Sequence, residues 1–232
     1  MTQRAEYLAA LGLEDWRQRR PLVAQPAAAA PATPAWAQPV HSVCGTDSWD
    51  IVGGEVAGCL RCPLHQTRTN TVFGVGNRQA DWLVVGEAPG AEEDKQGEPF
   101  VGRAGGLLNS MLRGIGLARE QVFIANVLKC RPPANRDPRP EEVAQCLPYL
   151  ERQIGLLQPK IMLAVGRIAA QNLLATDTPI GKLRGHVHRF GSAGIPLVVT
   201  YHPAYLLRSP TEKRKAWEDL KFARRVAAGA NA

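Results

Sequence analysis

Four cysteines of this 232-residue chain have a spacing that suits metal ligation. Cys59 and Cys62 form a C-x-x-C step, which places two thiolates on one tight turn. Cys130 and Cys146 are too far apart for a second such turn, so we expect a loop and a helix to bring them to the same centre. Zinc and a four-iron cluster both accept four cysteines, and the spacing leaves that choice open. Two further alternatives are unrelated buried thiols and a thioredoxin-like redox pair, although residues 51–70 lack the clear strand and helix that such a pair needs.

Polar side chains accompany the ends of several short apolar runs. Glu87 follows the first run, Asn126 lies near the end of the second, and His202 follows the fourth. Taken alone, Asn126 could cap a helix and His202 could be a hydrogen-bonded turn residue. Because all three recur at the same place relative to a run, we expect them to share one site. The four runs cover residues 82–85, 122–127, 161–165 and 197–200.

The order of these runs along the chain predicts the fold class. They are rich in β-branched residues and alternate with helical patterns, which is typical of βαβ units and a parallel sheet. Right-handed connections between such units give an α/β protein, a three-layer α/β/α sandwich. Ligands of these sheets bind outside the carboxyl ends of the strands, where the polar side chains would meet. The helical patterns cover residues 104–115, 141–157, 167–174 and 211–228.

The first fifty residues differ in amino-acid composition from the rest of the chain. Residues 1–20 read as a short amphipathic helix, which is either a docking helix for a protein partner or an extension without a role. Residues 21–50 form an Ala/Pro-rich linker: of residues 21–40, thirteen are Ala or Pro and none is charged. We assign residues 51–232 to the folded domain.

Composition excludes several classes of protein. No apolar run reaches the length of a membrane span, and no secretory signal is evident, so five cysteines do not suggest a disulfide framework. We expect a cytoplasmic monomer. The net charge of +7 favours a polyanionic partner. Basic residues that could contact phosphates fall into two groups, Lys129, Arg131, Arg136 and Arg139, and Lys182, Arg184, His186, His188 and Arg189.

Four segments resemble the motifs of the family 4 uracil-DNA glycosylases. They are residues 86–94, 97–102, 126–136 and 202–208. The resemblance extends over about residues 55–225, and Cys59, Cys62, Cys130 and Cys146 match the family's [4Fe-4S] ligands in order and approximate spacing. It implies a four-stranded parallel sheet and the removal of uracil from DNA by cleavage of the N-glycosidic bond. The partner would be uracil-containing DNA, with the protein associated with the nucleoid while bound.

The resemblance also implies roles for residues that contact the flipped base. Phe100 matches the stacking position, and the backbone at Ala88 would lie close to the base. Asn126 would donate to uracil O4 and accept from N3–H, which rejects cytosine. His202 would donate to O2, where negative charge develops. Asn135 matches a further polar position.

Glu87 and Glu93 match the acidic positions that orient the attacking water and stabilise the cationic sugar, and the sequence does not divide these tasks between them. Two other functions compete with catalysis: a non-catalytic iron–sulfur DNA-binding damage sensor and an electron-transfer protein. Neither needs Glu87, Phe100, Asn126 and His202 together, so their joint presence favours the enzyme.

Overall fold

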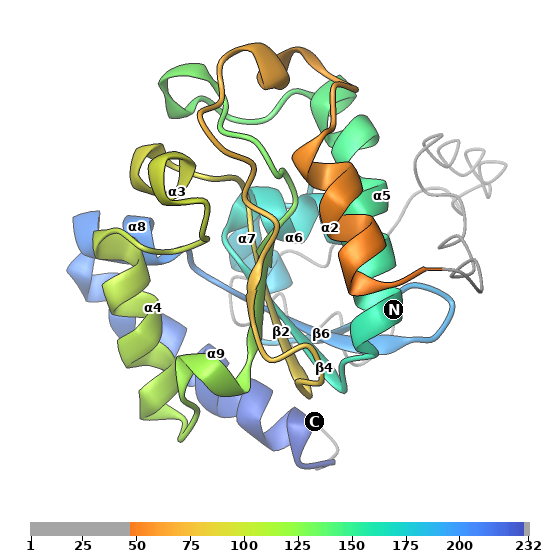
Figure 1. Ribbon diagram of the computed structural model, residues 1–232. Coiled ribbons are helices and arrows are strands. Elements are labelled where there is room, and N and C mark those ends of the chain that lie inside the picture. The colour runs from red at the N-terminus through yellow and green to blue at the C-terminus, as the bar shows by residue number, and fades with distance from the viewer. Residues whose placement is uncertain (1–46, 230–232) are drawn as a thin grey trace, which may run out of the picture. The chain divides into compact units, whose positions relative to one another are not determined.

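The computed structural model describes residues 47–229 (Figure 1). Contacts divide the chain into residues 1–34 and residues 35–232, and all described residues belong to the second unit. The helix expected at 1–20, nearly all of the expected linker and Cys44 lie outside the described part. No helix among residues 47–229 is long and apolar enough to cross a membrane.

A six-stranded mixed sheet forms the centre of this unit, in the order β1-β3-β2-β4-β6-β5. The four expected runs form its inner strands, and each neighbouring pair of them is parallel. The α/β class is confirmed, but the expected four strands are too few, because β1 and β5 add antiparallel edges. The strands are β1 (Val75–Gly76), β2 (Trp82–Gly86), β3 (Phe123–Asn126), β4 (Ile161–Val165), β5 (Val187–Phe190) and β6 (Ile195–Thr200).

The missed edge strands lack the signal that revealed the inner ones. β1 has only two residues, and β5 is a partly exposed strand that contains His188 and Arg189 of the second basic group. Inner strands such as β2 and β4 are buried throughout, which is why they appear as unbroken apolar runs.

Helices cover both faces of the sheet, so the layers are helix, sheet and helix (Figure 1). Alternate residues of β2 point to opposite faces: Leu83 and Val85 join one hydrophobic cluster, and Val84 joins the other. The first cluster includes α2 (Trp49–Ala57), α5 (Pro140–Leu157), α6 (Arg167–Leu174) and α7 (Ile180–Leu183). The second includes α4 (Arg103–Gly114), α8 (Pro203–Arg208) and α9 (Lys213–Ala227). The short α3 (Ala91–Gln96) follows β2, and 3-10 turns are η1 (Pro63–Gln66), η2 (Arg119–Gln121), η3 (Pro133–Asn135) and η4 (Pro210–Glu212).

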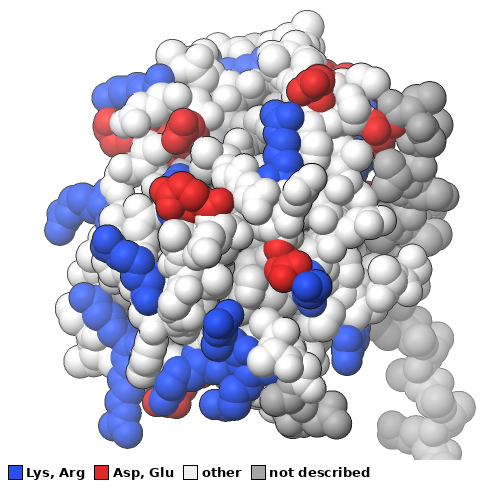
Figure 2. All heavy atoms as spheres, turned by 60° about the horizontal axis from the view of Figure 1, so that its bottom comes forward, with Lys and Arg blue, Asp and Glu red and all other residues white. Residues whose placement is uncertain are grey.

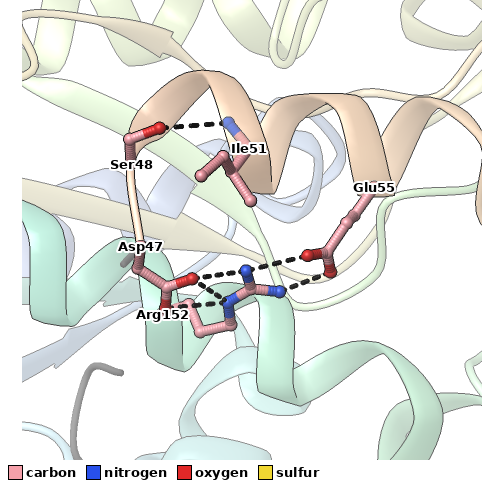
Figure 3. A network of polar contacts seen from close by, with 5 residues as sticks. All are labelled: Asp47, Ser48, Ile51, Glu55 and Arg152. Carbon is pink, nitrogen blue, oxygen red and sulfur yellow. Dashed lines mark hydrogen bonds and ion pairs between the residues drawn. The ribbon is translucent and has the colours of Figure 1, made fainter. Parts of the chain in front are cut away.

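The helix α2 begins inside the segment expected to be linker. Ser48 caps it by accepting a hydrogen bond from the amide of Ile51 at 3.2 Å. Arg152 of α5 lies between Asp47 and Glu55 and donates to both carboxylates (Figure 3). The expected boundary at residue 50 therefore falls within α2, which ion pairs hold against α5.

Candidate active site

One cleft of about 460 Å³ lies at the carboxyl ends of the inner strands. Its walls come from segments that are far apart in the sequence: the loop after β2, α3, the end of β3, the turn η3 and the start of α8. All seven residues singled out in the sequence line it, namely Glu87, Ala88, Glu93, Phe100, Asn126, Asn135 and His202. The sheet topology thus brings the expected site residues together.

Phe100 and His202 form an aromatic pair in the cleft. Their rings are stacked, with centroids 5.5 Å apart and an angle of 29° between the planes. Phe100 has a positive φ of 55°, which is costly for a bulky residue. Arg119 supports this conformation by donating to the Phe100 carbonyl at 3.3 Å and the Pro99 carbonyl at 2.6 Å. Arg119 was missed in the sequence, because nothing local to η2 indicates a contact with a residue nineteen positions earlier.

Two glycines give this arrangement its space. A Cβ atom at Gly105 would lie 1.8 Å from the Phe100 carbonyl oxygen. A Cβ atom at Gly86 would lie 2.4 Å from Asn126 Oδ1 and 2.7 Å from the Phe100 ring. All three distances are shorter than van der Waals contact, so a larger residue at either glycine would displace Phe100 or Asn126, which line the cleft.

Asn126 carries an unpaired polar atom at the end of β3. The residue is 2% exposed, and its Oδ1 has no hydrogen-bond partner among the described residues. Nearly all buried polar atoms in proteins are paired, and leaving one unpaired costs about 1–3 kcal/mol. An acceptor that is buried beside a cleft and lacks a donor is suited to a ligand that brings an N–H group.

His202 is held as a neutral imidazole with its proton on Nε2. The amide of Ala204 donates to His202 Nδ1 at 3.1 Å, so that nitrogen must be unprotonated. Burial lowers the pKa of His202 to about 4, and the charge of Arg208 acts in the same direction, whereas Glu93 opposes it. The ring is therefore a neutral hydrogen-bond donor over the physiological pH range.

The two carboxylates of the cleft have different surroundings. Glu93 Oε1 accepts from the amides of Val101 and Gly102 at 3.1 and 3.3 Å, so Glu93 holds the loop that follows Phe100. Glu87 has no hydrogen bond to its carboxyl group from residues 47–229. Burial is the main cause that raises the pKa of Glu87 to about 7, and Asp137 adds to it. A carboxyl group with a pKa near neutrality is suited to proton transfer.

The rim of the cleft contains Asn135, which the sequence singled out, and Asp137, which it did not. Asp137 forms an ion pair with Arg167 at 2.6 Å, close enough to Glu87 to affect its pKa. Asn135 is exposed, has a positive φ of 53° and accepts from Arg131 Nε at 2.7 Å. The segment that contains Asn135 and Asp137 turns sharply, and only the tertiary structure shows which of its side chains face the cleft.

The four cysteines whose spacing suits metal ligation line a second cavity, between α2, η1 and α5. Arg68 donates to Cys130 Sγ at 3.1 Å, and the amide of Lys129 donates to Cys146 Sγ at 3.1 Å. Within residues 47–229, no three Cys, His, Asp or Glu side chains are gathered closely enough to hold a single metal ion. The sequence predicted that a loop and a helix bring Cys130 and Cys146 toward the C-x-x-C step. Cys130 lies in the segment that follows β3, and Cys146 lies on α5.

Several basic residues expected to contact DNA have internal partners instead. Lys129 is 1% exposed, Arg136 pairs with Glu142 at 2.5 Å, and Arg184 pairs with the buried Asp219 at 2.7 Å. Figure 2 shows the molecule turned so that the bottom of Figure 1 comes forward, and Lys and Arg side chains gather along the lower left of this face. On the helix α9, the basic residues are Lys213, Arg214, Lys215, Lys221, Arg224 and Arg225.

Comparison with known proteins agrees with this geometry. The profile of the uracil DNA glycosylase superfamily matches residues 73–221. A type-4 uracil-DNA glycosylase of Archaeoglobus fulgidus is 47% identical over 181 residues, which are 75% of this chain and 91% of the relative. A type-4 uracil-DNA glycosylase of Thermotoga maritima is 45% identical over 179 residues, 75% of this chain and 92% of the relative. A type-5 uracil-DNA glycosylase of Thermus thermophilus is 35% identical over 119 residues, which are 45% of this chain and 54% of the relative. The chain therefore belongs to the uracil-DNA glycosylase superfamily and, within it, to the type-4 uracil-DNA glycosylases.

Proposed function

We propose that this protein removes uracil from DNA by hydrolysing the N-glycosidic bond, which leaves free uracil and an abasic site. The observation that carries this proposal is the unpaired Oδ1 of Asn126 at the cleft. Uracil presents N3–H to such an acceptor, while the amide nitrogen of Asn126 can donate to uracil O4. Cytosine lacks the N3 proton and has an amino group in place of O4, so it would leave the buried amide unsatisfied.

The base must leave the duplex before these groups can reach it. The ring of Phe100 offers a flat apolar surface on which a flipped base can stack, and the backbone at Ala88 lines the same cleft. Tyr205 and Arg208 lie at the rim on α8, where a side chain could fill the space that the base vacates.

His202 stabilises the departing base. Breakage of the bond between C1′ and N1 leaves negative charge on uracil, part of it on O2. The Nε2–H of the neutral imidazole donates to this oxygen, and the Ala204 amide keeps the donor fixed in that tautomer. His202 does not need to transfer its proton, since a preorganised donor lowers the barrier by position alone.

Glu87 and Glu93 take separate tasks in this proposal. Glu87, whose pKa is about 7, accepts a proton from the water whose oxygen bonds to C1′. Its carboxylate form also stabilises the positive charge that develops on the sugar. Glu93 acts through position, because its hydrogen bonds to Val101 and Gly102 hold the loop that carries Phe100.

We further propose that Cys59, Cys62, Cys130 and Cys146 hold a [4Fe-4S] cluster. The donor set suits it: four thiols line one cavity, yet they are not gathered around a single point as zinc ligands are. Each thiolate of a cluster binds a different iron, so wider separation is expected. The cluster would tie together the loop between α2 and η1, the segment after β3, and α5. Purified protein should absorb broadly at about 400 nm, and replacement of any of the four cysteines should abolish the colour, whereas Cys44→Ser should not.

Other features of the proposal rest on the sequence. We retain uracil-containing DNA as the partner, a monomeric state, and a cytoplasmic location with association to the nucleoid. A protein partner for the first residues also remains a prediction. A damage sensor without catalysis would need no buried, unpaired amide beside a stacking ring and a neutral imidazole, so the cleft favours the enzyme.

A direct assay tests the proposed reaction. The protein is incubated with duplexes that carry one uracil or, as a control, one cytosine at the same position, and alkali then cleaves abasic sites. We expect cleavage of the uracil strand only, and a rate about a hundred- to a thousand-fold lower for His202→Ala. Absence of alkali-sensitive sites with the iron-containing protein would contradict the proposal.

A further inference from the structure

The buried side chain of Lys129 lies between the cleft and the cysteine cavity without a carboxylate partner. Its Nζ donates to the Asn126 carbonyl oxygen at 2.9 Å and to Gln153 Oε1 at 2.6 Å. Both acceptors are neutral, and no ion pair joins Lys129 to any acidic residue of the described chain. An ammonium group in a dry interior is unfavourable unless a negative charge compensates it, so this position calls for one.

The cysteine cavity is where that negative charge would be. The amide of Lys129 itself donates to Cys146 Sγ at 3.1 Å, and Arg68 donates to Cys130 Sγ at the same distance. Four thiolates carry more negative charge than the iron–sulfide core carries positive charge, so a filled cavity is anionic. Three cations line this cavity, Arg61, Arg68 and Lys129, and of these only Lys129 is fully buried.

The other contacts of Lys129 lead to the residue that recognises the base. Its Nζ holds the carbonyl group of Asn126, whose amide lines the cleft. Gln153, the second acceptor, lies on α5, the helix that also carries Cys146. Gln153 in turn donates to the Phe73 carbonyl at 3.0 Å, which fixes its own orientation. Lys129 therefore lines the cysteine cavity and also binds the backbone of a residue that lines the cleft.

We propose that Lys129 is a positioning residue that links the cysteine cavity to Asn126, so that recognition of uracil depends on the filled cavity. This inference rests on the function proposed above. The charge of the filled cavity keeps the ammonium in place, and the ammonium fixes the end of β3, from which the Asn126 side chain projects. Lys129 does not contact the substrate in this arrangement, and its effect on recognition passes through Asn126.

The test compares the iron-containing protein with its Lys129→Met variant, which keeps the length and burial of the side chain but removes the ammonium. The dissociation constant of free uracil, the iron content per chain and the midpoint of thermal unfolding are measured for both. We expect uracil to bind about tenfold more weakly to the variant, as is typical for the loss of a hydrogen bond from a charged group. We also expect the variant to lose its absorbance in air faster than the parent does.

Leu150→Ala is the matched control for general destabilisation. Leu150 is fully buried on α5 and belongs to the same hydrophobic cluster, but it does not line the cleft or the cysteine cavity. This variant should unfold at a lower temperature and bind uracil as the parent does. Weaker uracil binding in Lys129→Met together with unchanged binding in Leu150→Ala supports the link.

The remaining outcomes are also decisive. If Lys129→Met binds uracil like the parent, the inference is wrong, even if the variant has lost iron. If Lys129→Met does not fold, Gln153→Met decides: it removes the acceptor on α5 and should weaken uracil binding in the same direction, and unchanged binding would overturn the inference. If the parent protein neither binds nor excises uracil, the proposed function itself is wrong.

Discussion

The amide of Asn126 is the residue on which discrimination between bases depends. In Asn126→Asp, a carboxylate replaces the group that donates to uracil O4, and it can accept from the amino group of cytosine instead. We therefore expect the preference for uracil over cytosine to fall by about tenfold or more, since a buried mismatch costs about 1–3 kcal/mol. Single-turnover cleavage of uracil and cytosine duplexes measures the preference.

Asn77→Asp is the control for that change. Asn77 is exposed and does not line the cleft, and its Oδ1 accepts from the amide of Gln79 at 2.9 Å, as a carboxylate oxygen also can, so the same substitution there should leave the preference unchanged. If Asn126→Asp discriminates as well as the parent does, the role assigned to Asn126 is incorrect.

Glu87 predicts the pH dependence of the reaction. A raised pKa means that the carboxyl group keeps its proton up to about pH 7, and only the carboxylate present above that pH can accept a proton from water. His202, with a pKa of about 4, is already neutral over this range and adds no second transition. The single-turnover rate should thus rise roughly tenfold per pH unit below about pH 7 and level off above it.

The variant Glu87→Gln should be slow and show no such rise. Glu92→Gln, at an exposed position on α3, should keep the profile of the parent. A rate that is independent of pH in the parent protein would exclude Glu87 as the group that titrates.

At the scale of elements, Gly105 in the first turn of α4 packs closely against the backbone of Phe100, in the loop that precedes the helix. Gly105→Ala would place a methyl group within 1.8 Å of the Phe100 carbonyl, so the loop must shift and move the Phe100 ring. We expect cleavage to fall at least about tenfold, because small displacements of positioned groups are costly in catalysis. Gly106→Ala, where a Cβ atom has nothing within 4 Å, should retain the parent rate.

The helices α2 and α5 depend on the ion pairs of Arg152 (Figure 3). Hydrogen bonds from Arg152 hold the pKa values of Asp47 and Glu55 below their ordinary values of 3.8 and 4.5. Carboxylates with lowered pKa values stabilise the folded state above those ordinary values, and the contribution disappears as pH falls through the lowered ones. Arg152→Met should therefore unfold a few degrees below the parent at pH 7, with a difference that shrinks below about pH 4.

Thermal unfolding of parent and variant across this pH range checks the prediction. Arg167 lies on α6 and forms an exposed ion pair with Asp137. Arg167→Met removes this pair and should lower the unfolding temperature less than Arg152→Met does, because surface ion pairs contribute about 0–1 kcal/mol to stability. An equal loss in both variants would show that the contacts between α2 and α5 do not depend on Arg152.

At the scale of the whole molecule, the described residues that line the cleft and the cysteine cavity all lie at Val56 or later in the chain. Removal of residues 1–46 should therefore leave the rate on short uracil duplexes within about twofold of that of the full chain. This change is far smaller than the loss of rate expected when a catalytic hydrogen-bond donor such as His202 is removed. Removal of residues 1–50 also deletes Asp47 and the Ser48 cap, so it should lower the unfolding temperature. A large loss of rate from the shorter deletion would mean that the first residues contribute to the reaction.

Much of the fold was predictable because its signal is local. Most residues of the four inner strands are buried, which favours apolar residues on both faces of each strand, and α6 begins and ends where its sequence pattern does. The rule that ligands bind at the carboxyl ends of parallel strands then predicts that Glu87, Asn126 and His202 lie together, and all three line the cleft.

The tertiary structure decided what depends on residues distant in sequence. Lys129 and Arg184 look like surface charges in the sequence, and only packing shows that they are buried or paired internally. The proton of His202 is fixed by an amide, and the pKa of Glu87 is set by burial, so neither follows from residue type. Residue type and spacing determine which groups are present at the site. Protonation, charge pairing and hydrogen bonding depend on the surroundings, which exist only once the chain has folded.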